Sequence, residues 1–162
     1  MTVMYIRYKF GAMSPFLPGE AILYPVKEPR AIVTRCAHSL GLWTYPIMTN
    51  LAVCVTGRRV LISCLALPPQ RMEIDLWFPA CGPHERMETI VSASLDSGYW
   101  GPCVEIHSVD PARKRHFFSA PELKTRVYCE ASEELARVIA EQIGRNGQPG
   151  EPSNEYRTER VD

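Results

Sequence analysis

The chain has 162 residues, of which 46% are hydrophobic and 22% charged, and its 18 basic and 18 acidic residues cancel. This length suits a single domain with its own core, since a chain of ~150 residues buries roughly 70% of its unfolded surface. The balanced charge argues against a dedicated nucleic-acid binder, which carries a basic excess to displace counterions. No apolar stretch approaches the ~18 residues that a membrane-spanning helix needs.

The two ends of the chain differ from its middle. Residues 1–16 place Arg7 and Lys9 inside an apolar run, which is not the pattern of a secretion signal. We therefore expect an irregular segment or an extra strand at residues 1–16. Because the secretion pattern is missing, we also expect the protein to be cytoplasmic. Residues 145–162 are polar and rich in Pro and Gly, so we expect a disordered tail that buries too little apolar surface to offset chain entropy. Residues 17–144 form the expected domain.

Nine short apolar runs, separated by Pro, Gly and charged residues, are enough for the seven or eight short strands that we expect. The runs lie at 21–24, 31–34, 51–56, 59–64, 74–78, 89–95, 103–109, 115–118 and 124–129. The two runs on either side of Gly57 and Arg58 are expected to form a hairpin. Strands repeated every ~8–12 residues are typical of an antiparallel sandwich or small barrel rather than of βαβ units.

One stretch near the C-terminus has helical periodicity. Its apolar residues recur at spacings of three and four: Ala131, Leu135, Val138, Ile139 and Ile143. Ser132 stands where an N-cap is needed, and Glu133 and Glu134 follow where the helix dipole favours negative charge. The sequence therefore predicts an amphipathic helix over 132–143. Such a helix can close the open end of a bent barrel, which indicates an α+β architecture.

Three segments carry a resemblance to a known family. Residues 17–20 (Leu-Pro-Gly-Glu) resemble the opening of GRAM domains, which belong to the pleckstrin-homology-like (PH-like) superfold. Residues 55–63 resemble the hairpin of these domains, and residues 128–135 resemble the entry into their closing helix. The resemblance spans about residues 17–144 and implies a bent antiparallel barrel of about seven strands closed by one C-terminal helix. Residues 65–87, with several prolines, depart from the pattern and look like a longer insertion.

Basic side chains beside the predicted turns are candidate anion ligands. The family resemblance suggests that Arg58 and Arg59 face an anionic head group. Neighbours in a strand point to opposite faces, so at most one of them can contact a given ligand. Arg113, Lys114 and Arg115 form a compact basic run that could bind a phosphate or an acidic partner. Both segments can equally be solvated turns.

Adjacent aromatic residues suggest a partner surface. Trp77 and Phe78 are consecutive, so in a regular strand only one of them can face the core. The other would be exposed unless a helix, a partner or a second copy covers it, and rigid aromatic rings contribute much of the affinity at protein interfaces. Other aromatic residues near predicted loops and strand ends either cap the core or line a partner surface: Trp43, Tyr45, Tyr99 and Trp100.

The six cysteines are irregularly spaced, and several lie in apolar strand-like runs, which predicts reduced, buried thiols. Cys36 with His38 and Cys81 with His84 could supply four zinc ligands, but their spacing matches no standard site, so we expect no metal. Cys81 beside His84 is the best candidate for the nucleophile of a cysteine-dependent hydrolase, which would need an exposed thiol of low pKa.

Together these observations predict a cytoplasmic, non-enzymatic binding module of PH-like, GRAM-type fold that uses no cofactor. We expect it to mediate protein–protein interaction or self-association. Two alternatives remain open. One is a module for anionic lipid head groups or small anions, with peripheral contact to an anionic membrane, and the other is the cysteine-dependent hydrolase. Nucleic acid is not an expected partner.

Overall fold

The computed structural model describes residues 16–28, 32–37, 43–48, 51–66, 70–113 and 120–147. Within these ranges the chain forms nine strands and one helix. The strands are β1 (Ile22–Glu28), β2 (Ile32–Ala37), β3 (Trp43–Met48), β4 (Leu51–Thr56), β5 (Arg59–Ala66), β6 (Gln70–Trp77), β7 (Thr89–Gly98), β8 (Gly101–Val109) and β9 (Glu122–Tyr128). The helix is α2 (Ser132–Gly147).

All nine strands belong to one sheet, in the order β1-β4-β5-β6-β7-β8-β9-β2-β3. Every neighbouring pair is antiparallel except β6 and β7, which share one parallel bridge between Trp77 and Thr89. The α+β prediction is confirmed as a mostly antiparallel sheet with a C-terminal helix packed on it. The described sheet has nine strands rather than about seven, and its end strands β1 and β3 do not pair with each other, so these strands do not close a barrel.

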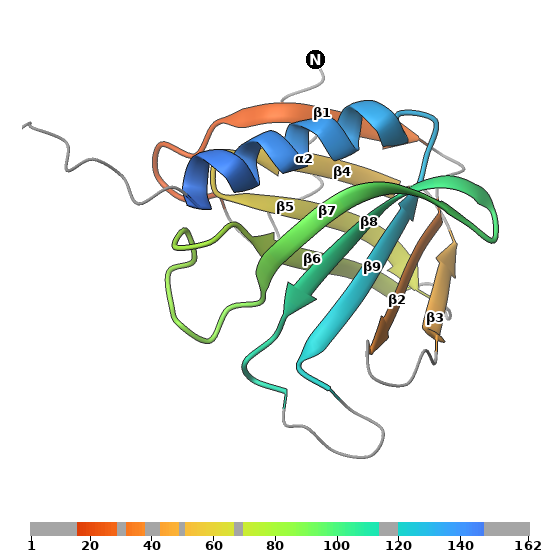
Figure 1. Ribbon diagram of the computed structural model, residues 1–162, viewed down its shortest axis with the longest axis horizontal. Coiled ribbons are helices and arrows are strands. Elements are labelled where there is room, and N and C mark those ends of the chain that lie inside the picture. Colours follow the sequence, from red (N-terminus) through yellow and green to blue (C-terminus); the bar gives the residue numbers. More distant parts are fainter. Residues whose placement is uncertain are drawn as a thin grey trace, which may run out of the picture.

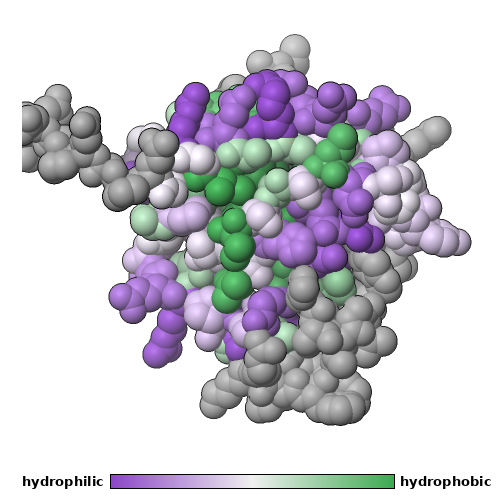
Figure 2. Space-filling view, in the orientation of Figure 1, coloured by the Kyte–Doolittle hydropathy of each residue, from purple (hydrophilic) through white to green (hydrophobic). Residues whose placement is uncertain are grey.

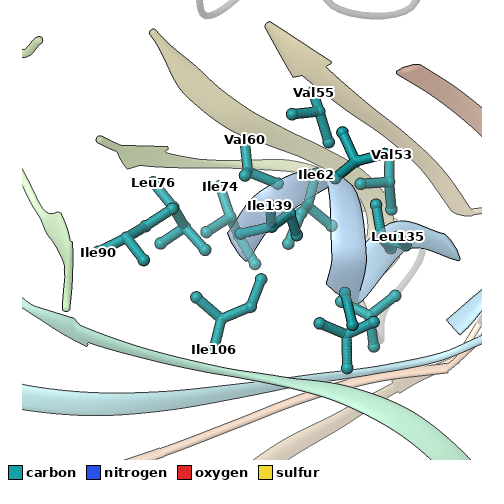
Figure 3. Close-up of a cluster of buried hydrophobic side chains, with 14 of the residues drawn as sticks. Val53, Val55, Val60, Ile62, Ile74, Leu76, Ile90, Ile106, Leu135 and Ile139 are labelled. Atoms are coloured by element: carbon teal, nitrogen blue, oxygen red, sulfur yellow. The ribbon is translucent and has the colours of Figure 1, made fainter. Parts of the chain in front are cut away.

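The sheet is strongly bent, and α2 lies across one end of it (Figure 1). Side chains from β4, β5 and β6 meet those from β8, β9 and β2 in a common core, into which α2 inserts Leu135 and Ile139 (Figure 3). Alternate residues of a strand point to one face, so β4 supplies Val53 and Val55 while Cys54 points the other way. The apolar face predicted for the helix is therefore the face that is buried.

Two hairpins organise the halves of the sheet. The hairpin predicted around Gly57 and Arg58 is confirmed, because β4 and β5 pair antiparallel across it. β7 and β8 form a second hairpin whose turn consists of Tyr99 and Trp100. Gly101 follows this turn with φ of 106°, a conformation that glycine adopts without the steric cost of a side chain.

The two end strands differ from expectation because each contains a proline. β3, which was not predicted, includes Pro46, and β1 continues through Pro25 beyond the predicted run. Proline removes a backbone donor, and in a sheet it is tolerated mainly in edge strands. Both strands are edges of the described sheet, so their prolines fit this rule.

Other predicted boundaries moved or lie outside the described residues. The segment at 65–87 contains β6 and the connection to β7. The helix continues through Gly147, so residues 145–147 belong to it rather than to a tail. The rest of that tail, the N-terminal residues 1–15 and the strand expected at 115–118 lie outside the described ranges.

The start of α2 is held against β8. Ala131 accepts the first helical hydrogen bond, from the backbone N–H of Leu135. The Ser132 hydroxyl, predicted as an N-cap, instead contacts the backbone of Cys129 and donates to the carbonyl of Pro102 at 3.3 Å. Because Pro102 is the second residue of β8, this bond places the first turn of the helix beside the β7–β8 turn.

A charged network lies on the face of β7, β8 and β9 that points away from the core. The carboxylate of Glu105 lies 2.6 Å from Nε of Arg126, 2.7 Å from Nε2 of His107 and 3.2 Å from Nζ of Lys124. Arg126 also reaches Asp96 at 3.2 Å. Burial by itself would raise the pKa of Glu105, but the hydrogen bonds from His107, Arg126 and Lys124 lower it to about 2.

This network predicts a pH dependence of stability. The pKa of Glu105 is below its ordinary value of 4.5, so its contribution is complete above about pH 4.5 and is lost as the pH falls toward 2. We expect the free energy of unfolding to fall by up to about 3 kcal/mol through this window because of Glu105. Urea titrations of wild type and Glu105→Gln should show a flatter profile in the variant. Glu141→Gln, on the exposed face of α2, should keep the wild-type slope.

The close approach of Gly98 to Tyr128 makes a second prediction. A Cβ at Gly98 would meet the Tyr128 ring, with Cε1 and Cζ at 2.7 Å and the hydroxyl closer still. Tyr128 is 5% exposed and has little room to move. We expect Gly98→Ala to lower stability by about 1–3 kcal/mol through overpacking, measured by thermal unfolding. Adding Tyr128→Phe should recover part of this loss, whereas no recovery would mean that the hydroxyl is not the obstacle.

Candidate functional site

Arg59, predicted as an anion ligand, is buried, with 2% of its side chain exposed. Its guanidinium forms a two-point ion pair with Glu20, from Nε to Oε1 at 2.8 Å and from Nη2 to Oε2 at 2.9 Å. Its Nη1 lies 3.2 Å from the carboxylate of Asp75, and its Cζ lies 4.6 Å from the ring centroid of Trp77. Carboxylates and an aromatic ring of the same chain therefore already occupy the guanidinium.

Glu20 is kept in its charged form. Burial would raise its pKa, but hydrogen bonds from the Arg59 side chain, the Leu17 backbone N–H and the Thr56 hydroxyl lower it overall. Thr56 also accepts hydrogen bonds from the backbone N–H groups of Arg58 and Arg59, at 3.1 and 3.0 Å. The turn between β4 and β5 is thus tied to the segment before β1. Arg59 holds the fold together, and Arg58 is the member of the pair that is exposed.

Trp77 and Phe78 are both buried, at 2% and 0% exposure, so the expectation that one of them is exposed is wrong. β6 ends at Trp77, and the backbone N–H of Phe78 bonds to the carbonyl of Arg58. Both rings are buried because this part of the sheet is covered on both of its faces. Phe78 then enters the main core, while Trp77 packs beneath Arg59 on the opposite face of the sheet. The structure leaves neither ring available as a partner surface.

The remaining basic and cysteine candidates are dispersed. Arg113 is partly buried and donates from Nε to the carbonyl of Ala120 at 3.2 Å, while Lys114 and Arg115 lie outside the described residues. Cys81 is partly buried, and its thiol contacts Oδ1 of Asn146 at 3.2 Å. Burial raises the pKa of the Cys81 thiol, opposite to what a nucleophile at neutral pH requires.

The zinc ligands that were considered are not assembled within the described residues. Cys36 is buried on β2, its proposed neighbour His38 lies outside the described residues, and His84 is exposed. The described part of the chain holds no group of three or more His, Cys, Asp or Glu residues arranged for a metal ion. The five cysteines whose side chains are described are all free thiols, at 36, 54, 81, 103 and 129.

Large apolar side chains are exposed along β7 and its turn. They are Val91, Leu95, Tyr99 and Trp100, with exposures of 60%, 52%, 88% and 46%, and we call this set the β7 apolar surface. Figure 2 shows apolar side chains gathered below the polar outer face of α2, on the side of the molecule where Figure 1 places β7. Single exposed apolar residues are normal on a protein surface, and large contiguous apolar patches are typical of interaction sites.

The aromatic end of this surface is held rigidly. Trp100 makes edge-to-face contacts with Tyr99, at 5.0 Å between ring centroids, and with the buried Tyr128 at 5.3 Å. Tyr128 belongs to β9, so the turn of one hairpin is anchored to the next strand of the sheet. Tyr99 therefore presents a large ring to solvent on a fixed support, and such rings lose little conformational entropy when they bind.

Leu95 is exposed although it lies on the core-facing side of β7. It pairs with Val104 of β8, which is fully buried, and Ala93 on the same side of β7 packs against the core. β6 pairs with β7 only at Thr89, so no strand among those described covers β7 beside Leu95. Val91 is exposed where the β7–β8 register shifts between Ile90 and Ser92.

The sequence pointed to only part of this surface. Tyr99 and Trp100 were among the aromatic candidates because they lie near predicted loops and strand ends. Val91 and Leu95 were not distinguished from core residues, since alternation along 89–95 suits a strand with one buried face. The serines at positions 92 and 94, which lie between these residues, were the sequence feature that could have indicated an exposed strand.

No family model, curated protein or solved structure matches the chain. Among the helices of the described residues, none combines the length and apolar character needed to cross a membrane.

The contrast between Arg59 and Arg58 is directly testable. Removing one member of a buried ion pair leaves the other charge unpaired, so Arg59→Ala should destabilise the fold by about 3–5 kcal/mol. Arg58→Ala, one residue away and exposed, should change stability by less than about 0.5 kcal/mol. Urea unfolding followed by tryptophan fluorescence measures both. Equal effects of the two substitutions would show that Arg59 is not buried with Glu20.

Proposed function

We propose that this chain is a non-enzymatic binding module of PH-like, GRAM-type fold whose ligand is another protein, contacted through the β7 apolar surface. The observation that carries the proposal is the aromatic turn, where Tyr99 is 88% exposed and packs on Trp100. Aromatic side chains near the centre of an interface supply much of its binding energy. A solvent-exposed aromatic pair fixed to a rigid sheet suits this role.

Two features support the PH-like assignment. The bent, mostly antiparallel sheet is covered at one end by a C-terminal helix, the arrangement that the GRAM resemblance implies. Two of the segments that carry the resemblance, around Glu20 and around Arg59, are joined by a buried ion pair although they are 39 residues apart. A contact between these segments gives the shared pattern a physical reason.

The alternatives receive less support from the geometry. An anion module built on the β4–β5 hairpin would have Arg58 but not Arg59, whose guanidinium is paired with Glu20. A hydrolase built on Cys81 would need a thiolate, and burial disfavours that form by raising the pKa of the thiol. The β7 apolar surface suits neither chemistry, whereas it suits a protein partner.

The test places a photo-crosslinking benzoylphenylalanine at Tyr99 of the full-length protein in its native cells. We expect discrete protein adducts, because a partner held at this turn lies within reach of the probe. The same probe at Ala112, an exposed turn residue between β8 and β9, is the matched control. Adducts should weaken at least about tenfold when Trp100→Ala removes the ring against which the side chain at position 99 packs. Identical adducts from both positions, or none from Tyr99, would contradict the proposal.

A further inference from the structure

β7 has one paired edge and one edge that the described strands leave open. β8 pairs along its whole length, whereas β6 contacts it only at Thr89. Counting from the pair formed by Gly98 and Gly101 at the turn, alternate residues direct their backbone N–H and C=O groups away from β8. These residues are Ala93, Leu95 and Ser97. The N–H of Ser97 accordingly bonds to the carboxylate of Asp96, at 2.8 Å, instead of pairing with β8.

The open edge of β7 lacks proline and lysine, two of the usual protections against pairing, although α2 packs against this strand. Pro25 in β1 and Pro46 in β3 interrupt the two outer edges of the sheet, and proteins commonly use proline and lysine in this way. β7 contains neither proline nor a basic residue. Its exposed residues Val91, Ser92, Ser94, Leu95 and Ser97 are uncharged, and its one charged side chain, Asp96, is 42% exposed. An extended chain that approaches the edge at Ala93 and Leu95 meets no proline there, and the charge nearest the turn is the Asp96 carboxylate on the Ser97 N–H.

Acidic side chains lie at one end of this edge. α2 runs alongside β7 (Figure 1), and the bond from Ser132 to Pro102 places its first turn beside the Gly98 end of the strand. That turn carries Glu133 and Glu134, while Arg137 one turn later pairs with Glu134. The acidic groups outnumber the basic ones here, so a basic residue would be favoured at this end.

We propose that β7 binds an extended segment of a partner protein as an additional strand of the sheet. Alternate apolar side chains of the segment cover Leu95 and Val91, and a basic residue at one end lies beside the first turn of α2. In this mode the backbone hydrogen bonds supply affinity and the side chains supply specificity. A second copy of β7 matches less well, because it offers no basic residue. The inference rests on the proposed function, which requires that a protein contact the β7 apolar surface but not that it pair with β7 as a strand.

The experiment selects binders from a library of random linear peptides displayed on phage, using the immobilised full-length protein. We expect enriched peptides to alternate apolar and polar residues and to carry Lys or Arg at one end. Leu95→Pro removes an N–H from the open edge but not from the pairing with β8, and it should weaken these peptides at least about tenfold. Leu95→Ala keeps the N–H and should weaken them less, while Leu23→Ala, an exposed leucine on β1, should leave them unchanged.

A second experiment uses only the wild-type protein, so it tests strand addition even if Leu95→Pro does not fold. The best peptide is synthesised with N-methyl groups on alternate amides, in both registers, and titrated against wild type. One register should lose at least about tenfold in affinity and the other should bind normally, since only alternate N–H groups of an added strand face β7. No enriched peptide, equal loss in both registers, or a larger loss from Leu95→Ala than from Leu95→Pro would overturn strand addition. Crosslinking at Tyr99 could still succeed in that case, so the two proposals fail separately.

Discussion

The buried ion pair between Glu20 and Arg59 is the constraint on which the arrangement of this protein depends. An unpaired charge at either position would cost several kcal/mol, so the segment before β1 must lie against the β4–β5 hairpin. Phe16 and Ile22 then cover Cys54 and Leu61 on the face opposite the main core. One half of the sheet is consequently buried on both faces, which a nine-stranded antiparallel sheet does not by itself require.

The half of the sheet formed by β7, β8 and β9 has an apolar layer on one face only. α2 covers one end of β7 and β8, and the outward face carries the Glu105 network rather than a second apolar layer. Between these lies β7, which joins the two halves through a single bridge and keeps apolar side chains in solvent. Most of the large exposed apolar side chains among the described residues thus lie on β7 and its turn, where strand pairing is least complete. We propose that both features serve the binding of a partner.

Sequence patterns over a few residues correctly predicted the features that depend on neighbouring residues, namely the buried face of the helix and the β4–β5 turn. The spacing of Leu135 and Ile139 predicted the buried face of the helix, and the glycine after Thr56 predicted the β4–β5 hairpin. β3 was not predicted because it contains Pro46, and proline is unfavourable inside a sheet. The structure places β3 at the edge of the sheet, where proline is tolerated. Of the β7 apolar surface, Tyr99 and Trp100 could be identified from the sequence because they lie near predicted loops and strand ends.

The sequence by itself determined which residues alternate along each strand, where the main turns fall, and which stripe of the helix is apolar, because these depend on neighbours a few positions apart. Only the tertiary structure decided that Arg59 is buried, that Trp77 and Phe78 both lie inside, and that Leu95 lies outside. Alternation separates two faces of a strand without saying which face another segment will cover. Glu20 is 39 residues from Arg59 in the chain, so its partnership arises only when the sheet brings the two segments together.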